Sequence, residues 1–228
     1  MFDFIKNKGI DLSLKSEEKL IEFKNLLINW NNKFNLTSIL DDEGIEIKHF
    51  EDSLIGEKYF PLNKKVVEIG SGGGFPSIPI MIVREDLNFT LVESVGKKCE
   101  FLKYVIEKLN LNGTVLNKRA EDIGRENLYR ESFDIVTARA VAKLNTLSEY
   151  SIPLIKKGGL FIAYKSDEKS ELIESKNAIN VLGGKVNKII DYELSNNKGK
   201  RKIYIIEKIN KTPNVYPRGN GKERNKPL

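Results

Sequence analysis

A glycine-rich stretch decides the fold of this chain: Val66-Val-Glu-Ile-Gly-Ser-Gly-Gly-Gly-Phe-Pro-Ser-Ile-Pro-Ile80. It opens with a short apolar run rich in β-branched residues, which is typical of a buried strand. Four glycines follow between positions 70 and 74, where they allow a sharp turn and let a ligand approach the backbone. Pro76 then stands at the expected start of a helix, where its fixed φ and missing N–H cost little. The stretch therefore predicts a strand, a tight loop and a helix, with a ligand beyond the carboxyl end of the strand.

Two classes of ligand compete for such a loop. A dinucleotide site needs the pattern G-x-G-x-x-G, but the third glycine would fall on Phe75, whose ring would crowd a pyrophosphate. The spacing Glu-x-Gly-x-Gly-x-Gly is instead met in full by Glu68, Gly70, Gly72 and Gly74. It resembles the first motif of S-adenosylmethionine-dependent methyltransferases, whose cofactor has no phosphate. We therefore predict an S-adenosylmethionine site, with a nicotinamide-dependent oxidoreductase as the alternative.

The segments around this loop alternate between two patterns. Short β-branched runs predict strands over 66–69, 89–93, 114–117, 133–138 and 160–165. Helix-like stretches lie between or after them, over 76–84, 97–110, 142–156 and 167–182. Two further strand-like runs, 185–193 and 201–209, have no helix between them and predict a hairpin. We expect an α/β, Rossmann-like methyltransferase fold whose mostly parallel seven-stranded sheet ends in an antiparallel hairpin.

Helical segments precede the sheet. Residues 16–33 form an amphipathic pattern with Ser16 as the expected N-cap, and 43–59 predict a second helix that ends before Pro61. Beyond the hairpin, the chain is rich in Pro, Gly, Asn and basic residues and is expected to be irregular. The predicted organisation is a helical extension packed on the core, a methyltransferase domain and a basic C-terminal tail, over residues 1–62, 63–210 and 211–228.

Further candidate site residues follow the predicted strands. Glu93 ends the second strand, where an acid typically holds ribose hydroxyls. In methyltransferases the loop after the third strand, here Ala120 and Glu121, contacts the adenine; an acid pair at a helix start would explain Glu121 and Asp122 equally well. Arg139 ends the fourth strand, and its charge needs a carboxylate or phosphate partner because it follows a mostly apolar run.

The positive charge of the chain is concentrated near its C-terminus. The net charge is +6, but the segment from Ser195 onward has ten basic and two acidic residues, so the rest of the chain is slightly acidic. Fold stability does not require this asymmetry, whereas a polyanionic partner would explain it. A solubilising tail is the alternative interpretation.

Composition excludes several other classes. The apolar runs are too short to span a bilayer and we see no signal peptide, so we expect a cytoplasmic protein without membrane contact. The single cysteine, Cys99, cannot form an internal disulfide. One cysteine and one histidine do not make a ligand cluster, so no metal is expected.

Residues missing from the end of the fourth strand narrow the chemistry. Methylation of an exocyclic base amine usually goes with Asn/Asp-Pro-Pro-Tyr/Phe there, but this chain has Thr137-Ala-Arg-Ala140. Methylation at pyrimidine C5 needs a cysteine nucleophile near the same place, and Cys99 belongs to another helix. Guanine N7 is consistent with this shortage, because its lone pair attacks without losing a proton and needs alignment rather than a general base.

These residues together resemble a known family, the ribosomal small subunit methyltransferase G family, also called glucose-inhibited division protein B. The resemblance covers nearly the whole chain. It rests on the segments Asn35-Leu-Thr-Ser38, His49-Phe-Glu-Asp-Ser-Leu54, Glu68 to Pro79, Phe133 to Ala142, Gly158 to Lys165, Tyr216-Pro-Arg218 and Lys226-Pro-Leu228. It implies methylation of guanine N7 in 16S rRNA of the small ribosomal subunit, with S-adenosylmethionine as donor.

The resemblance also implies roles for individual residues. The cofactor is expected to contact the loop and strand ends through Gly70, Gly72, Gly74, Phe75, Glu93, Ala120, Glu121 and Arg139. Arg139 and Lys165 are expected to position the reactants. The RNA is expected to contact Lys165, Arg201, Arg218, Lys222, Arg224 and Lys226. We expect a monomer, and a non-catalytic RNA-binding protein on the same fold remains an alternative.

Overall fold

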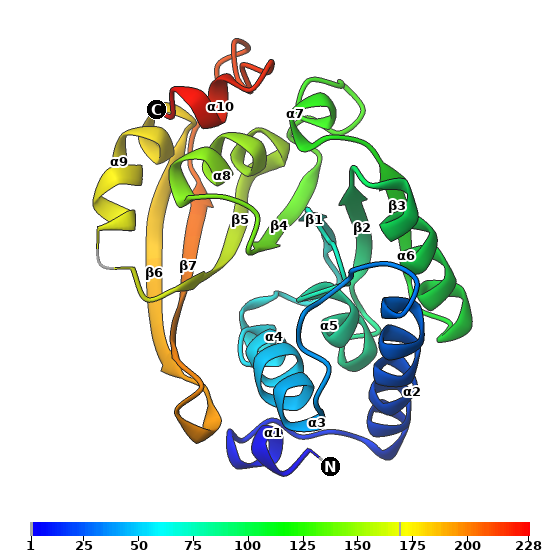
Figure 1. Ribbon diagram of the computed structural model, residues 1–228. Helices are drawn as coiled ribbons and strands as arrows, with labels where there is room; N and C mark the ends of the chain where they lie inside the picture. The colour runs from blue at the N-terminus through cyan, green and yellow to red at the C-terminus, as the bar shows by residue number, and fades with distance from the viewer. Residues whose placement is uncertain (1, 169) are drawn as a thin grey trace.

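A seven-stranded sheet forms the centre of the molecule (Figure 1). The structure is a computed structural model that describes residues 2–168 and 170–228. The strand order is β3-β2-β1-β4-β5-β7-β6. The strands are β1 (Lys65–Ile69), β2 (Asn88–Glu93), β3 (Gly113–Asn117), β4 (Phe133–Arg139), β5 (Ile155–Ser166), β6 (Gly184–Glu193) and β7 (Lys200–Lys208).

The pairing of the strands confirms the predicted fold class. Strands β1 to β5 pair in parallel, whereas β7 is antiparallel to both β5 and β6. The chain runs outward from β1 through β2 to β3, and then returns to place β4 on the other side of β1. This reversal between β1 and β4 is a topological switch point, and open α/β sheets bind ligands outside the carboxyl ends of the strands there.

Helices cover both faces of the sheet and bury two separate apolar cores. Successive strand residues point to opposite faces, so Val66 belongs to one core and Val67 to the other. The first core lies under the N-terminal extension with α5 (Ser77–Val83) and α6 (Gly96–Lys108). The second lies under α8 (Leu144–Ser151) and α9 (Glu171–Val181).

The N-terminal extension is helical as predicted, but its details differ. Helix α2 (Leu14–Asn31) begins before Ser16, and its N-cap is Ser13, whose hydroxyl accepts a hydrogen bond from the Ser16 N–H at 3.1 Å. Ser16 is instead buried within the first turn. A short α1 (Asp3–Asn7) that the sequence pattern did not reveal precedes it.

The second predicted helix, over 43–59, is broken into short pieces. They are α3 (Asp42–Gly44), a π-helix η1 (Ile45–Glu51), α4 (Asp52–Leu54) and a 3₁₀ turn η2 (Glu57–Tyr59). The π-helix changes the side-chain period, so the polar residues of this segment do not share one solvent face: His49, Glu51 and Asp52 are all buried.

The helices that follow β1 in the chain are shorter than the sequence predicts. The predicted helix over 142–156 is α8 followed by a 3₁₀ turn η3 (Ile152–Leu154). The predicted helix over 167–182 is α9, which begins only at Glu171; position 169 lies outside the described residues. The short helix α10 (Lys222–Asn225) was not predicted, whereas α7 (Ala120–Ile123) has Glu121 and Asp122 in its first turn, as the alternative interpretation of this acid pair expected. In the hairpin, a 3₁₀ turn η4 (Ser195–Asn197) joins β6 to β7.

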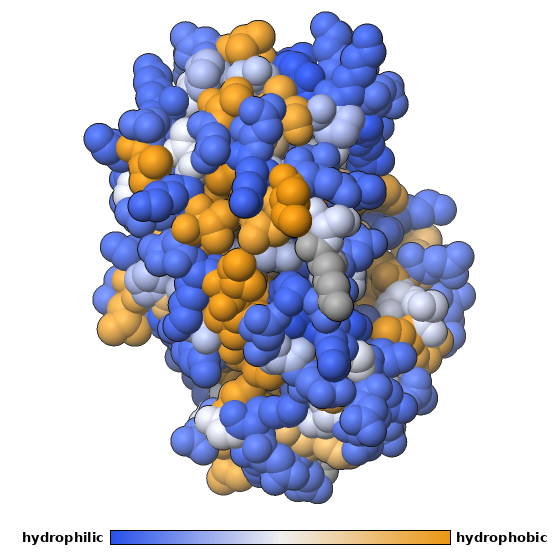
Figure 2. All heavy atoms as spheres, turned by 90° about the vertical axis from the view of Figure 1, so that its left-hand side faces the viewer, coloured by the Kyte–Doolittle hydropathy of each residue, from blue (hydrophilic) through white to orange (hydrophobic). Residues whose placement is uncertain are grey.

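The side of the molecule that carries α9 and the hairpin is mostly hydrophilic with an apolar streak (Figure 2). Ile173 of α9 and Ile189 of β6 are among the exposed large apolar side chains. Within the described part of the chain, no helix has the length and apolar character needed to cross a membrane.

Candidate functional site

The glycine loop is shaped by two close approaches. Gly70 has φ +68°, and a Cβ there would lie 2.7 Å from Cγ2 of Val141 in the segment after β4. Gly74 has φ +92°, and a Cβ there would lie 2.6 Å from Cγ1 of Ile78 in α5. Because side chains rarely adopt these angles and have no room here, both positions require glycine. Gly74 therefore allows α5 to pack closely on the loop, and its contact with a cofactor stays a prediction.

Glu93 ties the loop to the end of β2. Its Oε2 accepts a hydrogen bond from the Gly72 N–H at 2.9 Å, and its Oε1 accepts one from the Val95 N–H at 2.8 Å. Each carboxylate oxygen can accept a further bond, so Glu93 remains able to bind ribose hydroxyls while it orders the loop.

A cavity of about 450 Å³ opens beyond the carboxyl ends of β1 and β2, in the size range of small-molecule sites. We call it the first cavity. Four of the predicted cofactor residues line it: Gly70, Glu93, Ala120 and Glu121. Apolar walls come from Ile69, Val92 and Val141. The charged lining consists of three carboxylates, Glu93, Glu121 and Asp122, and four cations, Lys118, Arg119, Arg125 and Arg224. The apolar walls, exposed backbone and carboxylates of this cavity suit a nucleoside.

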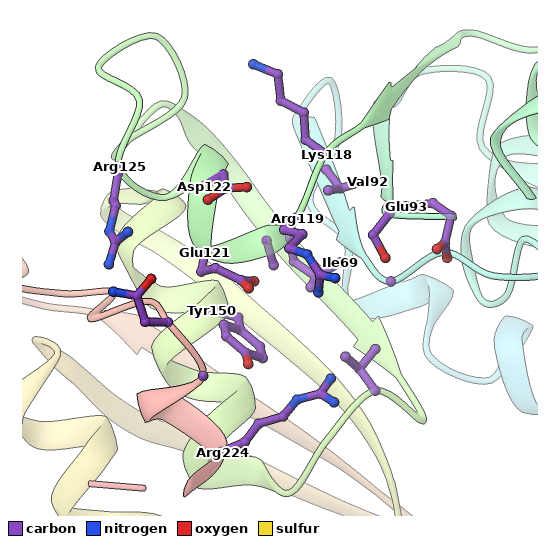
Figure 3. A pocket seen from close by; sticks show the side chains of 16 residues that line it. Ile69, Val92, Glu93, Lys118, Arg119, Glu121, Asp122, Arg125, Tyr150 and Arg224 are labelled. Carbon is purple, nitrogen blue, oxygen red and sulfur yellow. The ribbon is translucent and has the colours of Figure 1, made fainter. Parts of the chain in front are cut away.

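The C-terminal segment forms part of the wall of the first cavity, which the sequence did not predict. Asn220, Gly221 and Arg224 line it together with Tyr150 of α8. In Figure 3, Arg224 extends from the C-terminal segment toward the cavity, and Glu93 and Ile69 lie on the other side. Arg224, which the sequence assigned to RNA, thus stands at the predicted cofactor site.

Buried ion pairs and backbone contacts hold this segment against the core. Arg218 forms an ion pair with buried Glu149 of α8, with Nη2 and Oε2 at 2.7 Å. Arg130 donates hydrogen bonds to the carbonyls of Tyr216 and Thr212 at 2.7 and 2.9 Å. The segment is largely irregular, as predicted, apart from the short helix α10, but it is packed against the core. Arg218 is committed to Glu149, because a charge as buried as that of Glu149 requires a partner, whereas Lys222 and Lys226 are exposed.

A second cavity, of about 360 Å³, lies beyond the carboxyl ends of β4 and β5. It is lined by Ile39, Lys48, His49, Asp52, Arg139, Ala140, Tyr164, Lys165, Ser166 and Arg201. It therefore gathers three predicted site residues, Arg139, Lys165 and Arg201, away from the lining of the first cavity. Lys48 and Asp52 were not singled out as site residues from the sequence, although Asp52 belongs to the quoted segment His49 to Leu54.

Arg139 connects the N-terminal extension to the end of β4. Its Nη1 forms an ion pair with Asp52 Oδ2 at 2.7 Å and a hydrogen bond with the Lys48 carbonyl at 3.0 Å. Its guanidinium carbon lies 5.1 Å from the centre of the Phe75 ring. The predicted carboxylate partner is thus confirmed as Asp52. Neither Phe75 nor Arg139 lines the first cavity, so their contact with a cofactor stays a prediction.

His49 is a neutral acceptor in this cluster. Its ring stacks on Phe75 with centroids 4.2 Å apart, and its Nδ1 lies 3.2 Å from Arg139 Nη2, which can only donate. The proton is therefore assigned to Nε2, which lies 2.8 Å from the Thr37 hydroxyl. Burial lowers the pKa of His49 to about 3, with the charge of Arg139 as a second cause. Both ring nitrogens are engaged, so His49 organises the site rather than exchanging protons.

The ammonium of Lys165 is also bound within the protein. Its Nζ forms an ion pair with buried Glu171 Oε1 at 2.6 Å and donates to the Ala142 carbonyl at 2.8 Å. Since the Ala142 carbonyl belongs to the segment after β4, Lys165 fixes the position of this segment. Its predicted contact with RNA would require it to share or leave Glu171.

Glu68 occupies a fully buried position behind the glycine loop. The hydroxyls of Ser71 and Ser77 adjoin its carboxylate and partly offset the effect of burial on its pKa. Burial raises the pKa of Glu68 to about 8. Burial thus favours the protonated form of the first-motif acid, and Glu68 does not belong to the lining of the first cavity.

The fold and the cavity at its switch point define the class of Rossmann-like, S-adenosylmethionine-dependent methyltransferases. Solved structures support the fold. A methyltransferase from Pyrococcus furiosus matches 68% of this chain and 81% of its own, with a TM-score of 0.53 and 19% identity. A SAM-dependent methyltransferase from Methanosarcina mazei matches 68% and 97%, with a TM-score of 0.53 and 11% identity.

Sequence comparison then gives the family. The model described as rRNA small subunit methyltransferase G matches residues 16–203. The Ribosomal RNA small subunit methyltransferase G of Brevibacillus brevis is 45% identical over 97% of this chain and 94% of its own. That of Staphylococcus carnosus is 43% identical over 98% and 95%. The chain belongs to the rRNA small subunit methyltransferase G family, and these matches give no support to an oxidoreductase.

Proposed function

We propose that this protein transfers a methyl group from S-adenosylmethionine to N7 of a guanosine in the 16S rRNA of the small ribosomal subunit. The observation that carries the proposal is the pair of cavities on either side of residues 139–141. Each has four cations in its lining, but the first also has three carboxylates and apolar walls, whereas the second has Asp52 as its single carboxylate. The names of the relatives support rRNA as the substrate.

The first cavity would hold the donor. Glu93 would accept hydrogen bonds from the ribose, Ala120 and Glu121 would contact the adenine, and Gly70 would let the ligand approach the backbone. Arg139 and Phe75 would lie toward the methionine end. Bound S-adenosylmethionine supplies a methyl group on a sulfonium, which a neutral nitrogen lone pair can displace without losing a proton.

The chain's own residues then have to position the base and exclude water. His49 has both nitrogens engaged, and Lys165 and Arg139 are ion-paired, so these three would align the reactants rather than act as general bases. Alignment of reacting atoms can contribute roughly 7–11 kcal/mol to lowering a barrier. This fits guanine N7, which carries no proton.

The RNA would bind the cationic side of the molecule. Arg201 lines the second cavity, and Lys222 and Lys226 extend from the C-terminal segment into solvent. Arg224 would contact the donor or the RNA at the mouth of the first cavity. We propose that the protein acts in the cytoplasm as a monomer.

A transfer experiment tests this function. Purified protein is mixed with methyl-labelled S-adenosylmethionine and small ribosomal subunits from cells that lack the activity. We expect label in the 16S rRNA at a single guanosine, located by a cleavage specific for N7-methylguanosine. Label at another base atom would overturn the N7 assignment, and absence of label in rRNA would overturn the substrate.

A further inference from the structure

The two cavities share the segment that follows β4. Val141 lines the first cavity, whereas Arg139 and Ala140 line the second. Ala140 has φ +57°, a left-handed conformation that alanine rarely adopts and that tends to occur at functional sites. The chain therefore turns sharply at this point and presents consecutive residues to the two cavities. A ligand in the second cavity lies directly across this segment from a donor in the first.

The charge of the second cavity indicates what it would bind. Four of its lining residues are cations, Lys48, Arg139, Lys165 and Arg201, and Asp52 is the one carboxylate among the residues assigned to its lining. Burial keeps the pKa of His49 low, so its ring adds no charge at neutral pH. Such an excess of positive charge in a concave site attracts an anion such as a phosphate.

Two of these cations remain available. Arg139 and Lys165 are paired at 2.7 and 2.6 Å with Asp52 and Glu171. Lys48 offers its ammonium to no hydrogen bond or ion pair with another described residue, and only its backbone carbonyl is used, by Arg139. Arg201 donates from Nη1 to the neighbouring Lys200 carbonyl at 3.0 Å, and its Nε lies 3.9 Å from Asp52.

We propose that the second cavity receives the acceptor nucleotide, and that Lys48 and Arg201 bind its phosphate. The assignment of guanosine rests on the proposed function. The cavity of about 360 Å³ accommodates one nucleotide drawn out of its stack. Arg139 and Lys165 stay in their short ion pairs. Lys48, together with Arg201, whose ion pair with Asp52 is long at 3.9 Å, provides the charge-assisted hydrogen bonds that a phosphate accepts.

The test compares two ligands that differ only in the phosphate. Guanosine 5′-monophosphate and guanosine are titrated, up to millimolar concentration, into protein saturated with S-adenosylhomocysteine, with binding followed by NMR. We expect the monophosphate to bind roughly tenfold more tightly than guanosine, as one charge-assisted contact contributes. Lys48→Ala and Arg201→Ala should each remove most of this difference without changing the affinity for S-adenosylhomocysteine. Lys58→Ala, which removes an exposed lysine of the same extension outside both cavities, should keep it.

The outcomes separate this proposal from the function. If the wild-type protein does not prefer the monophosphate, or if the Lys48→Ala and Arg201→Ala variants prefer it as strongly as wild type, the second cavity does not hold the acceptor phosphate and the proposal is wrong, even if rRNA is methylated. If Lys48→Ala weakens binding of S-adenosylhomocysteine instead, the cavity belongs to the donor. If the two variants lose the preference as expected but the wild-type protein transfers no methyl group to rRNA, the proposed function fails while the nucleotide site stands.

Discussion

The two ends of the chain are attached to the same sheet by different kinds of interaction. The N-terminal extension packs through aromatic rings: Phe23 of α2 contacts Phe50, Phe75 and Phe101 at centroid distances of 6.0, 5.3 and 6.4 Å. The C-terminal segment packs Tyr216 and Leu228 against the second core, but it is also held by the Arg218–Glu149 ion pair and by Arg130. Apolar packing is spread over many contacts and does not depend on salt, whereas the polar attachment depends on a few charges.

This contrast has a functional side. His49 and Asp52 of the extension contact Phe75 of the glycine loop and Arg139 at the end of β4, and so set the position of Arg139. The C-terminal segment reaches it through Arg224, on the wall of the first cavity. The extension therefore fixes the residue at the end of β4, and the C-terminal segment forms part of the wall of the first cavity.

The largest effect on stability is expected in the aromatic packing. Phe23→Ala should lower the free energy of unfolding by about 3–5 kcal/mol, because it leaves a cavity among three rings. Urea unfolding at low and high salt measures this, and the loss should be the same in both. A loss that changes strongly with salt would mean that charges, and not packing, attach the extension.

A smaller loss is expected at the other end of the chain. Arg218→Ala should cost about 3 kcal/mol, since it leaves the buried carboxylate of Glu149 without its ion-pair partner. The double variant Arg218→Ala/Glu149→Gln is the control and should recover part of the loss. Unchanged stability of Arg218→Ala would show that the C-terminal segment is held by other contacts.

Lowering the pH from 7 to 5 should reduce the free energy of unfolding by about 2 kcal/mol through His49 of the N-terminal extension. The folded-state pKa of His49 is about 3 against an ordinary 6.5, so between these values the unfolded chain binds a proton that the folded protein does not. The contribution of His49 to stability is thus complete above pH 6.5 and falls as the pH falls toward 3. Unfolding of wild type and His49→Phe at pH 7 and pH 5 measures it: the wild type should lose more stability at pH 5 than the variant. Equal losses would mean that His49 is not held neutral.

The smallest effect concerns two cations on one short helix. Arg224→Ala should weaken donor binding roughly five- to tenfold, because Arg224 lines the first cavity. Lys222→Ala, its neighbour on α10, should leave donor affinity unchanged and reduce the salt dependence of RNA binding by about one phosphate contact. Calorimetry with S-adenosylhomocysteine and RNA binding over a range of salt separate the two. Equal effects of both variants on donor binding would mean that Arg224 does not contact the donor in the first cavity.

The same contrast explains how far the sequence could be interpreted. The glycine loop, the strands and the hairpin are encoded by local patterns, so most strand bounds were predicted to within one residue. The exception is β5, which begins at Ile155, five residues before the predicted start. The C-terminal segment is ordered by partners far along the chain, and Arg218 lies 69 positions from Glu149. No local signal identifies such a partner, so the sequence indicated a basic tail but not its packing against the core. The π-helix at Ile45–Glu51 shifts the side-chain period, which hid the burial of His49 and Asp52.

The central claim is that the glycine loop at the switch point binds S-adenosylmethionine, and Gly72→Asp tests it most directly. Gly72 has φ +52°, which aspartate tolerates, and a Cβ there meets only the Gly70 carbonyl oxygen at 3.8 Å, so the fold should persist. Gly158→Asp, at another open glycine with φ +80°, is the matched control. We predict that calorimetry shows S-adenosylmethionine binding to wild type and to Gly158→Asp. In Gly72→Asp the affinity should fall at least a hundredfold, about 2.7 kcal/mol. The reason is that the Gly72 N–H is bound to Glu93, so the new carboxylate is added next to Glu93, where the ligand must approach. Equal affinity in all three proteins would contradict the claim and place the donor elsewhere.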